Sequence, residues 1–139
     1  MKLKPYSSTA LLLAGLILVS IGLYFIFLRP SLLPEDLKYI GSTLDVVKQN
    51  LPGLSNWLQK VFWVMGGYIF TTGLLIIFLS VTSFRNRLPG AFSIVAFAGI
   101  SSIGLMTVVN FIISSDFKWL FLIFTLPWAS ALIFYRLHK

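Results

Sequence analysis

Residues 61–84 read VFWVMGGYIFTTGLLIIFLSVTSF, and none of these side chains is charged. The run stops at two neighbouring cations, Arg85 and Arg87. A helix rises about 1.5 Å per residue, so this run is long enough to cross a hydrocarbon core of about 30 Å. Because a peptide group in lipid needs a hydrogen bond within its own segment, the run predicts a membrane-spanning helix.

Other apolar runs stand on both sides of it. Residues 10–28 end at Arg29-Pro30, residues 91–113 follow the turn Leu88-Pro89-Gly90, and residues 117–135 carry Lys118 close to one end, where its ammonium can reach the headgroups. The chain of 139 residues is 58% hydrophobic and only 11% charged, which lies outside the range of soluble domains. We therefore predict one all-α integral membrane domain over residues 1–139, a bundle of four transmembrane helices.

The first run could also be a secretory signal, because Lys2 and Lys4 give it a basic start. The apolar stretch is too long for a signal peptide, and no small-x-small cleavage site follows it. We expect a retained helix.

The charges predict the orientation, because Lys and Arg beside spanning helices stay in the cytoplasm. With both termini inside, the cytoplasmic cations are Lys2, Lys4, Arg85, Arg87, Arg136 and Lys139, and all four carboxylates of the chain lie outside. The formal charge of +7 then reflects topology and contact with anionic lipids, not a nucleic-acid footprint. Short loops and the lack of glycosylation signals favour a bacterial inner membrane, that is, a plasma membrane.

The outer loop, residues 29–60, has its own pattern. Pro34, Glu35 and Asp36 suit the start of a helix, and Leu37, Ile40, Leu44, Val47 and Leu51 recur at helical spacing. This predicts an amphipathic helix over residues 34–51. Its apolar face rests on the bilayer or caps the bundle, or else the helix is a lid or a docking surface for another protein. The candidate docking residues are Glu35, Asp36, Lys38, Asp45 and Lys48.

The interiors of the four predicted helices contain no ionisable side chain, although such residues usually mark proton relays and substrate sites. Hydroxyls at Ser20, Thr71, Thr72, Ser101, Ser102 and Thr125 fall at a similar depth, about 12 to 15 Å. They form either a layer of interhelical hydrogen bonds or the polar floor of an outward pocket. Glycines seven residues apart, Gly15 with Gly22 and Gly66 with Gly73, predict faces where helices approach closely.

Several activities of four-helix membrane proteins are excluded by missing residues. The chain has no cysteine, which quinone-linked disulfide enzymes, claudins and tetraspanins need, and its single histidine, His138, leaves no axial haem ligand in a helix. The first helix lacks the glutamate of small multidrug transporters. The carboxylates have no histidine or cysteine beside them, so we expect no metal, no cofactor and no catalysis.

One stretch resembles a known family. Gly66-Gly67, Gly73, a run of aliphatics and the closing Arg85 are similar to the second helix of small bacterial membrane proteins of the DoxX-like type. The order of helices and loops is similar as well. The resemblance implies a four-helix bundle and no particular activity. An arginine is expected in the third helix of such proteins, but this sequence has none there and has Val109 and Asn110 in that region.

These observations favour a non-catalytic accessory or partner-binding subunit. The alternative is a binder or carrier of a lipid, quinone or other apolar ligand in an outward-facing pocket. Such a pocket would be lined by Tyr24, Trp63, Tyr68, Thr72 and Asn110. A closed interior would favour the first interpretation. The expected partners are membrane lipids and a protein partner or second copy of the chain, but no nucleic acid.

Overall fold

The computed structural model describes residues 4–137, and all regular elements in this part of the chain are helical. Lys2, His138 and Lys139, which were named above for their charge or ligand chemistry, lie outside these residues. The elements are α1 (Lys4–Phe27), α2 (Pro34–Ile40), α3 (Leu44–Asn50), α4 (Leu54–Val81), α5 (Ala91–Gly99), the π-helical η1 (Ile100–Gly104), α6 (Leu105–Ile112) and α7 (Lys118–Leu137).

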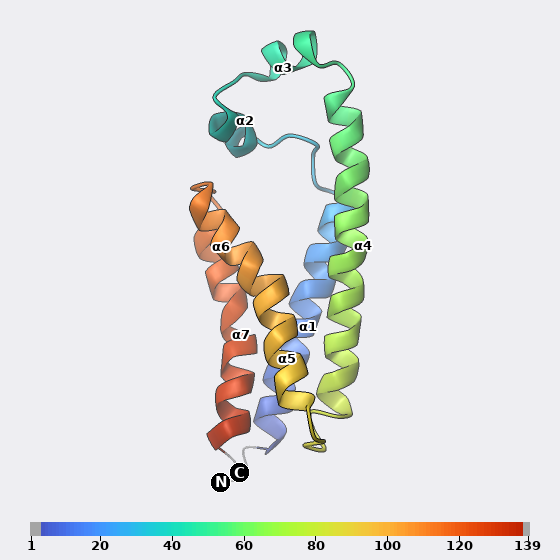
Figure 1. The fold of residues 1–139 in the computed structure, drawn as a ribbon, viewed down its shortest axis with the longest axis vertical. Coiled ribbons are helices and arrows are strands. Elements are labelled where there is room, and N and C mark those ends of the chain that lie inside the picture. Colours follow the sequence, from blue (N-terminus) through green and yellow to red (C-terminus); the bar gives the residue numbers. More distant parts are fainter. Residues whose placement is uncertain (1–3, 138–139) are drawn as a thin grey trace.

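Four helical segments are long and apolar enough to cross a membrane, so the chain is a multi-pass membrane protein. They are Tyr6–Phe27, Leu54–Val81, Ala91–Ile112 and Lys118–Leu137. The start of α1 and the end of α7 lie at one end of the molecule, and α2 and α3 lie at the other (Figure 1). We call these the terminal end and the loop end.

The predicted glycine faces meet each other between α1 and α4, as expected. A Cβ on Gly22 would stand 2.5 Å from the backbone nitrogen of Phe70, and one on Gly73 would stand 2.6 Å from that of Val19. Only glycine lets the two backbones approach this closely. The two helices therefore form one rigid wall of the molecule.

The other wall consists of α7 and the third span, which is α5, η1 and α6 in sequence. Gly99 has no room for a side chain because a Cβ would overlap the indole of Trp128. The Nε1 of Trp128 also donates a hydrogen bond to the carbonyl of Val95 at 3.0 Å. Directly after this contact the helix widens into the π-helical turn η1, a feature often found near functional sites.

The two walls pack together near the terminal end and separate toward the loop end (Figure 1). The buried core belongs largely to the packed part and includes Leu11, Leu18, Ile76, Phe84, Val95 and Ala131. This arrangement closes the molecule at one end and leaves space between the walls at the other.

The outer loop differs from the single helix predicted over residues 34–51. Gly41 adopts a left-handed conformation, with φ of 67°, and ends α2. Thr43 then caps α3, its side chain accepting from the backbone of Val46 at 3.4 Å. Within the predicted apolar stripe Val47 is buried, whereas Ile40 and Leu51 are exposed. Gly41 thus ends the helix within the periodic stretch, so the spacing of the apolar residues alone predicted one helix where there are two.

Helix α4 begins at Leu54, seven residues before the predicted start of the second span. Its 28 residues correspond to about 42 Å, longer than a hydrocarbon core of about 30 Å. The extra turns extend α4 beyond α6 and α7 at the loop end (Figure 1).

Candidate functional site

A large cleft lies between the two walls at the loop end. Its volume is about 1120 Å³. The α1 and α4 wall contributes Ser20, Tyr24, Phe25, Met65, Tyr68 and Thr72, and the opposite wall contributes Ser101, Ser102, Leu105, Met106, Asn110, Phe121 and Phe124. Most of the lining is aliphatic or aromatic, with polar groups at the mouth and hydroxyls deeper inside.

A strap, defined here as residues 30–40, runs from the end of α1 to the side of α6 and α7 (Figure 1), and its residues Leu33, Glu35 and Asp36 line the mouth of the cleft. On the α1 side it is held by Asp36, whose Oδ2 accepts from Arg29 Nη2 at 3.2 Å and from the backbone of Leu33 at 2.8 Å. The Arg29 guanidinium also lies 3.6 Å from the centre of the Phe62 ring. The Arg29 side chain is only 10% exposed. Ion pairing and stacking together fix this end of the strap to the first wall.

On the opposite side the strap is held by Glu35. Its Oε2 accepts a hydrogen bond from the Ser115 hydroxyl at 2.8 Å and one from the backbone nitrogen of Asp116 at 2.9 Å. Ser115 is fully buried, and its Oγ accepts in turn from the backbone of Phe117 at 3.0 Å. We call this pair of contacts the Glu35 latch. It ties the strap to the α6–α7 hairpin, so both walls hold the strap.

Four of the five residues predicted to line a ligand pocket lie in this cleft: Tyr24, Tyr68, Thr72 and Asn110. Trp63 does not line it. Its side chain is 44% exposed, and the ammonium of Lys60 lies 3.7 Å from the centre of its ring. Positions 62, 65 and 69 of α4 face the cleft, and position 63 falls outside this helical repeat. The sequence alone could not show which face of the helix Trp63 occupies.

The hydroxyls of the predicted polar layer mostly bond to their own helices. Ser20 donates to the carbonyl of Leu16 at 2.9 Å, Thr72 to that of Tyr68 at 2.8 Å, and Ser102 to that of Ala98 at 2.6 Å. Each of these bonds uses the hydroxyl's single donor and leaves the oxygen as an acceptor. They therefore form an acceptor-lined floor, not a layer of bonds between helices.

Thr125 is different, because it joins two helices. Its hydroxyl lies 3.0 Å from that of Thr107, which also lies 3.2 Å from the carbonyl of Phe121. Thr107 was not singled out from the sequence, although its spacing from Thr125 across the short turn was a usable signal. The pair holds α6 against α7 and keeps the second wall together.

The predicted docking residues divide into two groups. Glu35 and Asp36 are half-buried: Glu35 accepts from Ser115 and Asp36 pairs with Arg29. Both carboxylates have partners within the chain, and their part in docking stays a prediction. Lys38, Asp45 and Lys48 are exposed, as expected of residues outside the apolar stripe.

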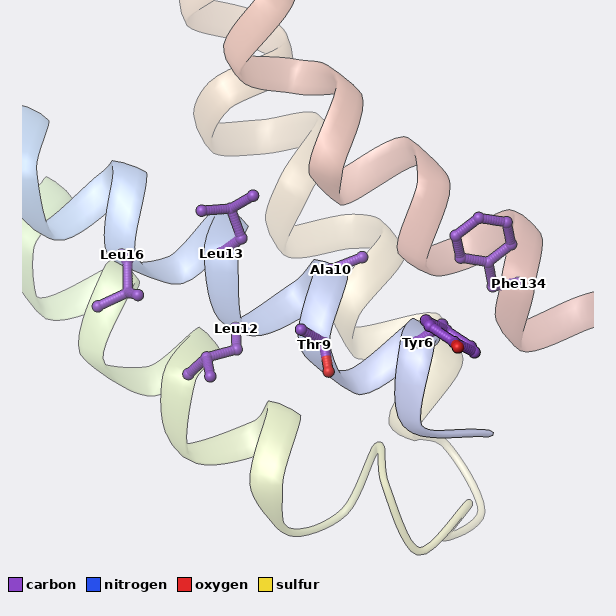
Figure 2. A pocket seen from close by; sticks show the side chains of 7 residues that line it. All are labelled: Tyr6, Thr9, Ala10, Leu12, Leu13, Leu16 and Phe134. Carbon is purple, nitrogen blue, oxygen red and sulfur yellow. The ribbon is translucent and has the colours of Figure 1, made fainter. Parts of the chain in front are cut away.

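A second hollow of about 440 Å³ lies at the terminal end, between α1 and α7. Figure 2 shows Tyr6 and Phe134 at one end of it and Leu13 and Leu16 at the other. The hollow is an open groove on the apolar surface of the spanning helices. In a bilayer such a groove is covered by acyl chains, so it offers no specific chemistry.

Within residues 4–137, no group of three or more His, Cys, Asp or Glu side chains is placed to hold a metal ion. The chemistry available in the cleft is therefore that of apolar contact, hydrogen-bond acceptors and the few charges at its mouth.

Comparison with protein-family models, curated proteins and solved structures finds no match for the chain. The resemblance to DoxX-like proteins stays a prediction.

Proposed function

We propose that this protein is a non-catalytic binder or carrier of one amphiphilic membrane molecule, a lipid or quinone, held in the cleft under the strap. The observation that carries the proposal is the volume of about 1120 Å³ with an apolar lining. Sites for drug-sized molecules and cofactors are usually about 300 to 1000 Å³ and mostly apolar. A larger, apolar cleft at membrane depth suits a molecule with long hydrocarbon chains.

The strap favours this function over the accessory subunit that the sequence favoured. A partner's spanning helix needs about 20 residues and continues into water at both ends. In this cleft its outer end would meet the strap, which Arg29 and the Glu35 latch hold in place. A hydrocarbon chain ends within the bilayer and fits below the strap without displacing it.

The orientation forms part of the proposal. Arg85, Arg87 and Arg136 lie toward the terminal end, and the carboxylates of Glu35 and Asp36 lie at the loop end. Under the positive-inside rule, the terminal end is cytoplasmic and the mouth of the cleft faces outward. Ligand would then exchange on the outer side of the membrane, and the short loops and lack of glycosylation signals favour a bacterial inner membrane.

Native mass spectrometry of the protein, extracted gently from its own membrane, tests this function. We expect a bound small molecule of defined mass at one per chain. Thr72→Trp fills the cleft and should remove that adduct. The matched control is Leu75→Trp, because Leu75 is 57% exposed on the same helix and does not line the cleft.

Retention of the adduct by Thr72→Trp would place the molecule elsewhere and refute the proposal. A stoichiometric polypeptide with no small molecule would instead establish the accessory role. Loss of the adduct from both tryptophan variants would mean nonspecific lipid binding around the helices.

A further inference from the structure

The mouth of the cleft carries a net negative charge. Its charged lining residues are Arg29, Glu35 and Asp36, so the formal charge there is negative by one. Arg29 is already engaged, because Nη2 pairs with Asp36, Nη1 donates to the carbonyl of Pro30 at 3.0 Å, and its face stacks on Phe62. A phosphate entering the mouth would find a neutralised arginine and a second carboxylate.

The same mouth retains hydrogen-bond acceptors. Glu35 uses Oε2 for both bonds of the latch, and Asp36 uses Oδ2 for both of its bonds. Over residues 4–137, neither Oε1 of Glu35 nor Oδ1 of Asp36 takes part in a hydrogen bond. Carboxylates accept at both oxygens, so each has capacity left for a ligand.

Deeper in the cleft, several oxygens are also free to accept hydrogen bonds. Asn110 donates one amide hydrogen to the carbonyl of Met106 at 2.9 Å, and its own carbonyl oxygen has no partner among the described residues. The hydroxyls of Ser20, Thr72 and Ser102 have used their donors on their own helices. The hydroxyls of Tyr24 and Tyr68 and the second amide hydrogen of Asn110 can still donate in the same cleft, so the bias toward acceptors is set by the carboxylates of the mouth.

We infer that the polar end of the ligand is a hydrogen-bond donor, either a hydroxyl or an ammonium group, and not an anionic phosphate. This inference rests on the proposed function and specifies its ligand. A donor satisfies the oxygens of Glu35 and Asp36, whereas an anion is repelled by them at a partly buried site where screening by water is weak. An anion would also be desolvated without a cation of its own.

Three lipids with identical chains test the inference: dioleoylglycerol with a hydroxyl, dioleoyl phosphatidylethanolamine with an ammonium, and dioleoyl phosphatidic acid with neither an amine nor a free glycerol hydroxyl. Delipidated protein is given an equimolar mixture and its adducts are measured by native mass spectrometry. We expect at least about a tenfold excess of one donor lipid over phosphatidic acid, equivalent to about 1.4 kcal/mol. An excess of the diacylglycerol identifies a hydroxyl, and an excess of the ethanolamine lipid identifies an ammonium.

Glu35→Gln removes the net negative charge at the mouth and keeps an oxygen that can accept from Ser115. It should reduce the excess to below about threefold. A threefold excess corresponds to about 0.7 kcal/mol, which is half of the free energy of a tenfold excess. Asp45→Asn makes the same change in net charge on exposed α3, outside the cleft, and should keep the tenfold excess.

Equal or stronger binding of phosphatidic acid would overturn the inference and leave the proposed function standing. An unchanged excess in Glu35→Gln would also overturn it, since the selectivity would then come from elsewhere. Failure of all three lipids to bind would overturn the inference as well, whereas the proposed function is decided separately by the adduct of the protein from its own membrane.

Discussion

Removing the Glu35 latch should free the strap from the α6–α7 hairpin. Two hydrogen bonds reach one charged oxygen, from Ser115 at 2.8 Å and from the backbone of Asp116 at 2.9 Å. Within residues 4–137 no other hydrogen bond or ion pair joins the strap to this hairpin. Glu35→Ala therefore removes the whole polar tie on that side.

The size of the effect follows from the type of bond. A hydrogen bond to a charged group contributes about 1.5 to 3 kcal/mol net. Because Glu35 is only half-buried and both bonds share one oxygen, we take about 2 kcal/mol for the latch as a whole. A change of this size alters the ratio of closed to open strap by about thirtyfold.

Distances between spin labels report this change. The chain has no cysteine, so Tyr39→Cys on the strap and Trp119→Cys on α7 supply the only two labels, and each native side chain is 61% exposed. In the doubly labelled protein we expect one narrow distance distribution. Glu35→Ala should add a longer and broader component, and Asp45→Ala, which also removes a carboxylate from the outer loop, should not. Coincident distributions with and without Glu35 would refute the latch.

Two further predictions concern the walls of the cleft. Gly22→Ala should destabilise the protein in detergent by about 1 to 3 kcal/mol, because the new Cβ would meet the backbone of Phe70, whereas Gly67→Ala, with open space around it, should be neutral or slightly stabilising. Equal unfolding midpoints for these two variants would contradict the close packing of α1 on α4. Thr107→Val and Thr125→Val, combined in a double-mutant cycle of unfolding free energies, should show a coupling of about 0.6 kcal/mol and no more than about 1.7 kcal/mol, and additive effects would exclude the hydroxyl pair.

The spans and their close contacts were predictable because they depend on local sequence. A long uncharged run has no alternative to a helix in lipid, so the four spans follow from composition and length. The contact of Gly22 and Gly73 with the opposite backbone follows from residues that have no side chain to keep helices apart. Both features are decided within one helix or by one residue type.

The cleft was not predictable in the same way. Whether four helices close or separate depends on how pairs of helices pack, and the contact of Trp128 with Gly99 and Val95 joins segments about 30 residues apart in sequence. The roles of Arg29 and Ser115 were missed for the same reason. Arg29 marked the end of a span, and nothing in the sequence indicated that it would stack on Phe62.

The adjacent carboxylates Glu35 and Asp36 explain how a very short helix can cover the cleft. Successive residues of a helix point about 100° apart, so neighbours in sequence can reach opposite walls. A helix of 7 residues has little stability of its own, because isolated helices shorter than about 12 residues are marginal in water. The position of α2 therefore depends on its tethers to Arg29 and Ser115. A ligand whose polar end binds the remaining oxygens of these two carboxylates would act on the same groups that hold the strap closed, which couples binding to the opening of the mouth.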